Sequence, residues 1–142
     1  MDAAAYSAFT DALSRRLDGD PRVVGLVALG SMSGDGPAPD DFSDHDFFVV
    51  TRSGAQEAYR TDLVWLPGAE RAVLVHRETE HGLKVILGDG HLLELAVFDP
   101  DELRVARANR YRVLLDRGGV AEGMAEVARS EEHTSELQSP VV

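Results

Sequence analysis

The sequence predicts an α/β (α+β) fold in which a mixed, twisted β-sheet is flanked by helices. Three observations predict it: an amphipathic segment over residues 3–18, several short apolar runs with the composition of strands, and turn-forming residues between those runs. A length of 142 residues suffices for one domain with its own core and is too short for two well-developed domains. We therefore expect one domain, within residues 1–128.

The first third of the chain predicts a helix followed by two buried strands. Nearly continuous apolar runs over residues 22–29 and 46–51 are typical of central strands that are buried on both faces. Prolines and glycines in residues 32–43 predict a loop between these strands. Residues 3–18 form the expected helix, because apolar residues recur there at spacings of three and four: Tyr6, Phe9, Leu13 and Leu17.

The rest of the body predicts further strands and one short helix. Gly88-Asp89-Gly90 indicates a tight hairpin turn, since glycines permit positive φ. Asp99-Pro100-Asp101-Glu102 indicates the start of a helix that continues to about Ala108, because proline and acidic residues favour the first turn. The expected strands are residues 63–66, 72–75, 83–87, 92–98 and 111–115.

The net charge of -11 limits the partners that the chain is expected to have. Binding along a nucleic-acid backbone requires clustered Lys and Arg, so a role on long DNA or RNA is not expected. An acidic surface attracts divalent cations and polycationic small molecules, although it also serves simply to keep a protein in solution. With no cysteine, no signal-peptide pattern and no apolar run of membrane-spanning length, the chain is expected to be cytoplasmic.

The C-terminal residues differ from the rest of the chain. Residues 129–139 resemble the translation of a common sequencing adapter. We therefore interpret residues 129–142 as an assembly artefact without evolved function, the alternative being a natural, disordered polar tail. On the first interpretation, the natural protein continues beyond Ala128.

Asp44, His45 and Asp46 precede the second buried strand and carry the first candidate chemistry. Side chains alternate along a strand, so the two aspartates are expected on one face and His45 on the other. Two carboxylates on one face suit Mg²⁺, which takes one or two protein carboxylates and completes its shell with phosphate and water oxygens. The alternative is a solvated turn that precedes a strand.

Two further features strengthen the metal interpretation. Gly30-Ser31 directly follows a buried strand, where the missing Cβ lets backbone amides approach a triphosphate and the serine hydroxyl can donate to it. Glu94 interrupts an apolar strand, so its charge must either face solvent or be paired, and a metal ion is one such partner. Whether these residues converge in space depends on the fold.

Structural roles are the simpler interpretation for the other polar and aromatic residues. Trp65 is expected in the core rather than stacked on an adenine. The histidines lack the spacing of a metal site and are expected at the surface or in packing: His45, His76, His81 and His91. Four cations could each reach a phosphate but are more simply solvated charges: Arg52, Lys84, Arg110 and Arg112.

Taken together, these residues resemble the nucleotidyltransferase superfamily with the polymerase-β-like core. The resemblance lies in a hydrophobic strand that ends at Gly30-Ser31, the aspartate pair after about twelve further residues, and a distant acid in a strand. Trp65-Leu66 and the segments 83–90 and 94–103 are similar to the streptomycin 6-adenylyltransferase type. The resemblance covers about residues 20–118.

The resemblance implies that a substrate hydroxyl attacks the α-phosphorus of ATP and releases pyrophosphate, with Mg²⁺ between the acids and the phosphates. Asp44 and Asp46 would ligate the metal, and Gly30 and Ser31 would hold the phosphates. Glu94 would ligate metal or act as general base. It stands where the close branch has aspartate, and its extra methylene moves the carboxylate. The C-terminal helical domain of the family is expected to be missing from this chain.

The expected function is transfer of AMP from ATP to a hydroxyl of a small molecule, an aminoglycoside being the first candidate, as in antibiotic resistance. Two alternatives remain. The chain could be a fragment that binds nucleotide or another protein without catalysis, so its standing as an enzyme is open. It could also be a toxin–antitoxin nucleotidyltransferase that acts on a protein or a tRNA. The sequence specifies neither the acceptor nor the oligomeric state.

Overall fold

The computed structural model describes residues 3–30, 45–108 and 110–138 of the chain. Residues 3–18 and 92–98 adopt the predicted helix and strand with the predicted bounds. The elements in these residues are α1 (Ala3–Asp18), β1 (Val23–Leu29), β2 (His45–Thr51), α2 (Gln56–Thr61), η2 (Ala69–Arg71), β3 (Ala72–Arg77), β4 (Gly82–Leu87), β5 (Leu92–Phe98), η3 (Glu102–Val105), β6 (Tyr111–Asp116) and α3 (Val120–Gln138), where η marks a 3-10 helix.

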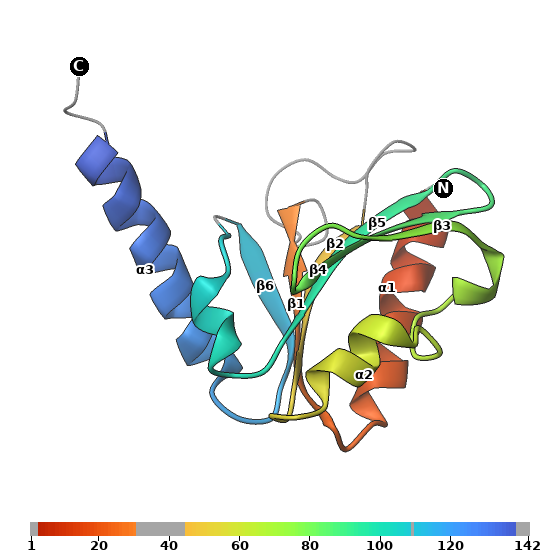
Figure 1. The fold of residues 1–142 in the computed structure, drawn as a ribbon, viewed down its shortest axis with the longest axis horizontal. Helices are drawn as coiled ribbons and strands as arrows, with labels where there is room; N and C mark the ends of the chain where they lie inside the picture. The colour runs from red at the N-terminus through yellow and green to blue at the C-terminus, as the bar shows by residue number, and fades with distance from the viewer. Residues whose placement is uncertain (1–2, 31–44, 109, 139–142) are drawn as a thin grey trace.

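The strands of the described residues form one six-stranded sheet in the order β3-β4-β5-β2-β1-β6. β2 and β5 run parallel, and the other neighbouring pairs are antiparallel. Figure 1 shows α1 and α2 on one side of this sheet and α3 on the other. The predicted fold class, a mixed sheet with flanking helices, is confirmed.

The face of the sheet under α1 carries the larger core. Leu13 and Leu17 of α1 are 0% exposed, because the apolar stripe of the helix packs on strand side chains that include Phe47 and Leu93. Packing of this stripe, more than helix propensity, stabilises α1. The Gly19 N–H donates to the carbonyl oxygen of Arg15 at 3.3 Å, at the predicted end of the helix.

α3 and η3 pack on the opposite face and form a second, smaller cluster with Phe48, Val50 and Phe98. Gly25 of β1 allows this packing, since a Cβ at that position would lie 2.5 Å from Cγ2 of Val120. Farther along β5 the same face is less covered, and Glu94 is only partly buried. This face therefore has both a packed region and an accessible one.

The prediction of a strand at residues 63–66 is wrong. The segment forms a turn in which the Leu66 N–H donates to the carbonyl oxygen of Leu63 at 2.9 Å. Trp65 and Leu66 are buried in the α1-side core without joining the sheet, and Pro67 with Gly68 (φ 82°) turns the chain away. The apolar run at residues 63–66 thus correctly indicated burial, but it did not indicate whether the segment pairs with a strand.

The predicted helix from Asp99 to about Ala108 is also wrong in extent. Asp99 and Glu102 form the expected start, because the Glu102 N–H donates to Asp99 Oδ1 at 2.7 Å and the Asp99 N–H donates to Glu102 Oε1 at 3.0 Å. Only the 3-10 helix η3 follows, and the backbone is extended by Ala106. With Leu103 as its buried residue, η3 lacks the apolar stripe that a longer helix would need.

α3 spans the end of the predicted domain and residues 129–138 of the predicted tail, so the division at Ala128 stays a prediction. No helix in the described part of the chain has the length and apolar character to span a membrane.

Candidate functional site

The sheet topology brings one end of β1 together with the starts of β2, β5 and β6. Ala28 pairs with Phe47 across β1 and β2, and Leu29 pairs with Tyr111 across β1 and β6. Gly30 and Asp46, from either side of residues 31–44, therefore lie at the same end of the sheet. Two of the residues singled out in the sequence therefore meet at this end of the sheet.

Asp46 and Glu94 are register partners in the parallel pair β2–β5. Register partners on neighbouring strands lie about 4.8 Å apart and point to the same face. Both side chains are partly buried, between fully buried neighbours on their own strands. The structure thus brings two of the three predicted acids together, whereas Asp44 and Ser31 lie outside the described residues.

Glu94 is paired with a lysine in the next strand. Lys84 of β4 is its register partner, and the Lys84 Nζ lies 3.8 Å from Glu94 Oε1 and 3.1 Å from Glu78 Oε1. The Glu94 side chain is 43% exposed. Its charge is therefore balanced by solvent and Lys84, so burial alone does not require a metal ion here. Lys84 was expected to be a solvated charge, and it instead lies in a row with Glu94 and Asp46 across three strands.

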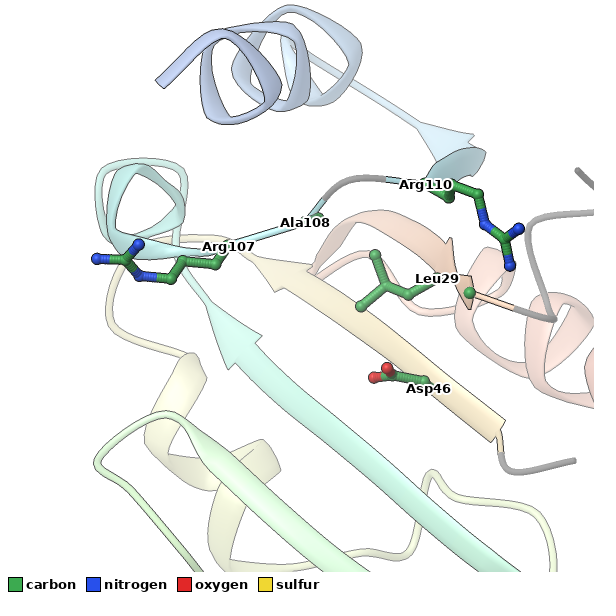
Figure 2. Close-up of a pocket in the computed structure, with 6 residues that line it drawn as sticks. Leu29, Asp46, Arg107, Ala108 and Arg110 are labelled. Carbon is green, nitrogen blue, oxygen red and sulfur yellow. The ribbon is translucent and has the colours of Figure 1, made fainter. Parts of the chain in front are cut away.

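Asp46 lines a pocket of about 400 Å³ together with residues from the end of β1 and the link between η3 and β6. Figure 2 shows the Asp46 side chain below Leu29, with Arg107 and Arg110 on opposite sides of the view and the Arg107 side chain extending away from Asp46. The other lining residues are Leu29, Gly30 and Ala108. An acid beside two cations can hold a ligand that carries both a metal ion and anionic groups.

Arg107 is a site residue that sequence reasoning missed, and Arg110 was assigned to solvent. Their segment reaches the pocket because the chain is extended after η3 instead of helical. A compositional signal was present, since five arginines occur within fourteen residues of a chain with net charge -11. These arginines are Arg104, Arg107, Arg110, Arg112 and Arg117.

Gly30 adopts a φ of 53°, a left-handed conformation that favours glycine. Its N–H donates to the carbonyl oxygen of Arg110 at 3.3 Å, which ties the end of β1 to the start of β6. Among the described residues, no atom lies within 4 Å of the place that a Cβ on Gly30 would take. The contribution of Gly30 to the pocket is therefore its conformation and lack of side chain, more than its own amide.

His45 lies on the opposite face from Asp46, as predicted from strand alternation. It is 0% exposed and stacks on the ring of Tyr6 at a centroid distance of 3.8 Å. Its Nδ1 contacts Nε2 of His91, which is also buried. Burial, together with the charge of His91, lowers the pKa of His45 to about 3. Both histidines are packing residues, as expected.

Trp65 is likewise a core residue. Its side chain is 6% exposed, and its Nε1–H donates to the carbonyl oxygen of Tyr59 at 2.9 Å. The expectation that Trp65 does not form a stacking platform for adenine agrees with this burial.

A scan against protein-family models matches no family, and a search of curated proteins finds no match. The function is therefore inferred from the residues of the pocket and their arrangement.

Proposed function

We propose that this chain carries the catalytic core of a Mg²⁺-dependent nucleotidyltransferase that transfers AMP from ATP to a hydroxyl of a small molecule. The observation that carries the proposal is the pairing of Asp46 with Glu94 on one face of the sheet, beside a pocket that also contains Gly30 and two arginines. The resemblance seen in the sequence includes Gly30, Asp46 and Glu94, and the fold brings these three residues to the same end of the sheet. This agreement supports the proposal.

The donor set fits the cofactor. Asp46 and Glu94 offer carboxylate oxygens from neighbouring strands, and Mg²⁺ is bound through one or two carboxylates with phosphate and water completing its shell. Bound Mg²⁺ would supply charge stabilisation for the phosphate oxygens. Asp44, which lies outside the described residues, is two positions before Asp46 in the sequence and would be a further ligand if the alternation of the strand continues to it.

The protein side chains would divide the remaining work. Arg107 and Arg110, with Ser31, would hold the anionic phosphates of ATP. Glu94 would either complete the metal shell or accept the proton of the attacking hydroxyl, and Lys84, with its Nζ 3.8 Å from Glu94 Oε1, would help to orient the carboxylate. Gly30, by its open position, would leave room for the phosphates beside the end of β1.

The net charge of -11 favours a cationic acceptor over an anionic one. Aminoglycosides are polycations with many hydroxyls, and this is why they are the first acceptor class to test. A tRNA acceptor would have to approach against this charge.

The test is pyrophosphate release from Mg-ATP in the presence of a panel of aminoglycosides. We expect Asp46→Asn to lower the rate by about 100-fold or more, the scale of losing one group that stabilises charge in a transition state. Asp101→Asn is a matched control, because the Asp101 side chain is 82% exposed and pairs with Arg104 away from the pocket. Equal rates in wild type and Asp46→Asn would contradict the assignment of Asp46.

The alternatives correspond to other outcomes of the same experiment. Binding of Mg-ATP without turnover on any acceptor would favour a nucleotide-binding fragment. Transfer of label from ATP to protein or tRNA in preference to aminoglycosides would favour the toxin–antitoxin type. No binding of Mg-ATP would reject nucleotidyl transfer and leave a protein-interaction domain.

A further inference from the structure

A second group of metal-ligating side chains lies at the opposite end of the sheet from Asp46. Glu80 and His81 stand in the turn between β3 and β4, and Glu102 begins η3. One ligand atom from each of the three side chains lies within 4.8 Å of the other two. His81 Nε2 and Glu102 Oε2 are 3.2 Å apart. We call these three residues the hairpin triad.

The Glu102 carboxylate is held in place from outside the hairpin triad. Its Oε1 accepts three hydrogen bonds, from Arg60 Nη2 at 3.1 Å, Gln56 Nε2 at 3.1 Å and the Asp99 N–H at 3.0 Å. Burial raises the pKa of Glu102, but the Asp99 N–H and the charge of Arg60 outweigh it and hold the pKa below its usual value. The three hydrogen bonds to Oε1 leave Oε2 directed toward His81.

The His81 ring is also positioned by its surroundings. It packs against Phe98 with ring centroids 5.1 Å apart, and the carbonyl oxygen of His81 accepts the Val97 N–H at 3.0 Å. The backbone carbonyl of Glu80 accepts a hydrogen bond from Arg77 at 2.6 Å, which fixes the turn that carries both residues. Two of the ligands are thus oriented by groups that would form the outer shell of a metal site.

We propose that the hairpin triad binds a zinc-class divalent ion through His81 Nε2 and the carboxylates of Glu80 and Glu102. Zn²⁺ is bound in proteins by imidazole nitrogen and carboxylate oxygen, and open zinc sites have three protein ligands with water in the fourth position. Mg²⁺ prefers oxygen ligands alone, so the histidine distinguishes this site from the acids near Asp46. Arg60, which contacts Oε1 of Glu102, would remain in the outer shell.

The ion would tie together segments that are distant in the sequence. The β3–β4 turn and η3 are separated by β4 and β5, and the His81–Glu102 contact spans 21 residues. A metal that binds the folded state and not the unfolded one stabilises the fold by mass action. The expected effect of the ion is thus on the stability of the fold, independent of the proposed nucleotidyl transfer.

The experiment is a titration of the full chain with Zn²⁺ and with Co²⁺ in excess Mg²⁺, followed by calorimetry and by the visible absorption of bound Co²⁺. We expect one site per chain that raises the thermal unfolding temperature. His81→Ala and Glu80→Gln should each weaken Zn²⁺ binding by about tenfold or more. Glu80 is exposed, so its variant tests the site even if a change at Glu102 disturbs η3.

Two controls separate this site from other binding. His76→Ala removes an exposed histidine of β3, and Asp46→Asn removes the acid of the pocket; both should bind Zn²⁺ as the wild type does. No saturable Zn²⁺ binding, or equal affinity in wild type, His81→Ala and Glu80→Gln, would overturn the proposal and leave the hairpin triad as an ion-pair network around Arg60.

Discussion

The two faces of the sheet place neighbouring residues of β2 in opposite environments. His45 points to the α1 side, where it is 0% exposed and packed between Tyr6 and Phe9. Asp46 points to the α3 side and lines an open pocket. One residue step along the strand therefore separates a buried, neutral ring from an accessible carboxylate.

The difference follows from what covers each face. α1 lies along its face and buries side chains from β1, β2, β4 and β5, whereas α3 and η3 pack on one region of theirs. Stability is concentrated on the closed face, and groups capable of chemistry lie on the open one. Substitutions on the α1 face should therefore affect folding, and substitutions on the α3 face should affect ligand binding.

The largest expected effect is on the closed face. Leu13→Ala removes a side chain that is 0% exposed and should lower the free energy of unfolding by about 2–5 kcal/mol, from lost apolar burial and the cavity left behind. Urea denaturation measures this change. Val105→Ala, at a position that is 62% exposed, is the control and should stay within about 0.5 kcal/mol of wild type. Similar losses in both variants would remove the distinction between a closed core and an exposed surface.

A pH dependence should arise from His45 on the same face. The folded pKa is about 3, below the ordinary value of 6.5, so between these values the unfolded chain binds the additional proton. The contribution of His45 to the free energy of unfolding is therefore fully present above pH 6.5. It is lost as the pH falls toward 3, by up to about 1.4 kcal/mol per pH unit. Urea denaturation at pH 7 and at pH 5 measures it, in a range where most carboxylates remain ionised.

A substitution at His45 isolates its share of this dependence. His45→Phe, whose ring can pack against Tyr6 and Phe9, should have a flatter stability profile between pH 7 and 5. His76→Gln, at an exposed position, should retain the wild-type slope. A slope that is the same in all three proteins would assign the pH dependence to other groups.

The smallest expected effect is on the open face. Arg110→Ala should weaken Mg-ATP binding by about tenfold, or about 1.4 kcal/mol, if its guanidinium contacts a phosphate, and should leave the urea midpoint unchanged. Arg104→Ala is the matched control, because Arg104 is exposed and pairs with Asp101 outside the pocket. An equal loss of affinity in both variants would indicate a general effect of net charge instead of a contact in the pocket.

The sequence was sufficient for most of the elements. The stripe of α1 and the apolar runs of β1, β2, β4 and β5 predicted these elements well, because local periodicity reports burial directly. Periodicity gave the wrong structure at residues 63–66, where Trp65 and Leu66 are buried in a turn that does not join the sheet. It also predicted a helix after Glu102 that is longer than the observed 3-10 helix. Tertiary packing decides both cases, and periodicity does not report it.

The site could be predicted only in part. The residue types and their order indicated Asp46 and Glu94 as members of one site, but their position side by side depends on the parallel pairing of β2 with β5, which are separated by α2, β3 and β4. The pairing of Glu94 with Lys84 depends on the β4–β5 register. Arg107 and the hairpin triad were not predicted for the same reason. Arg107 lines a pocket with residues of β1 and β2, and the hairpin triad combines the β3–β4 turn with η3, and only the folded chain brings these segments together.

The most direct test of the central claim, that the open face near Asp46 binds a metal–nucleotide complex, is paramagnetic broadening of backbone amide signals by Mn²⁺. The difference between spectra with Mn²⁺-ATP and with Mn²⁺ alone reports where the complex binds, because Mn²⁺ replaces Mg²⁺ at oxygen ligands. We expect broadening centred on Gly30, Asp46, Glu94 and Arg110, and its loss in Asp46→Asn. Broadening that ATP does not change, or that centres on residues of the α1 face, would contradict it.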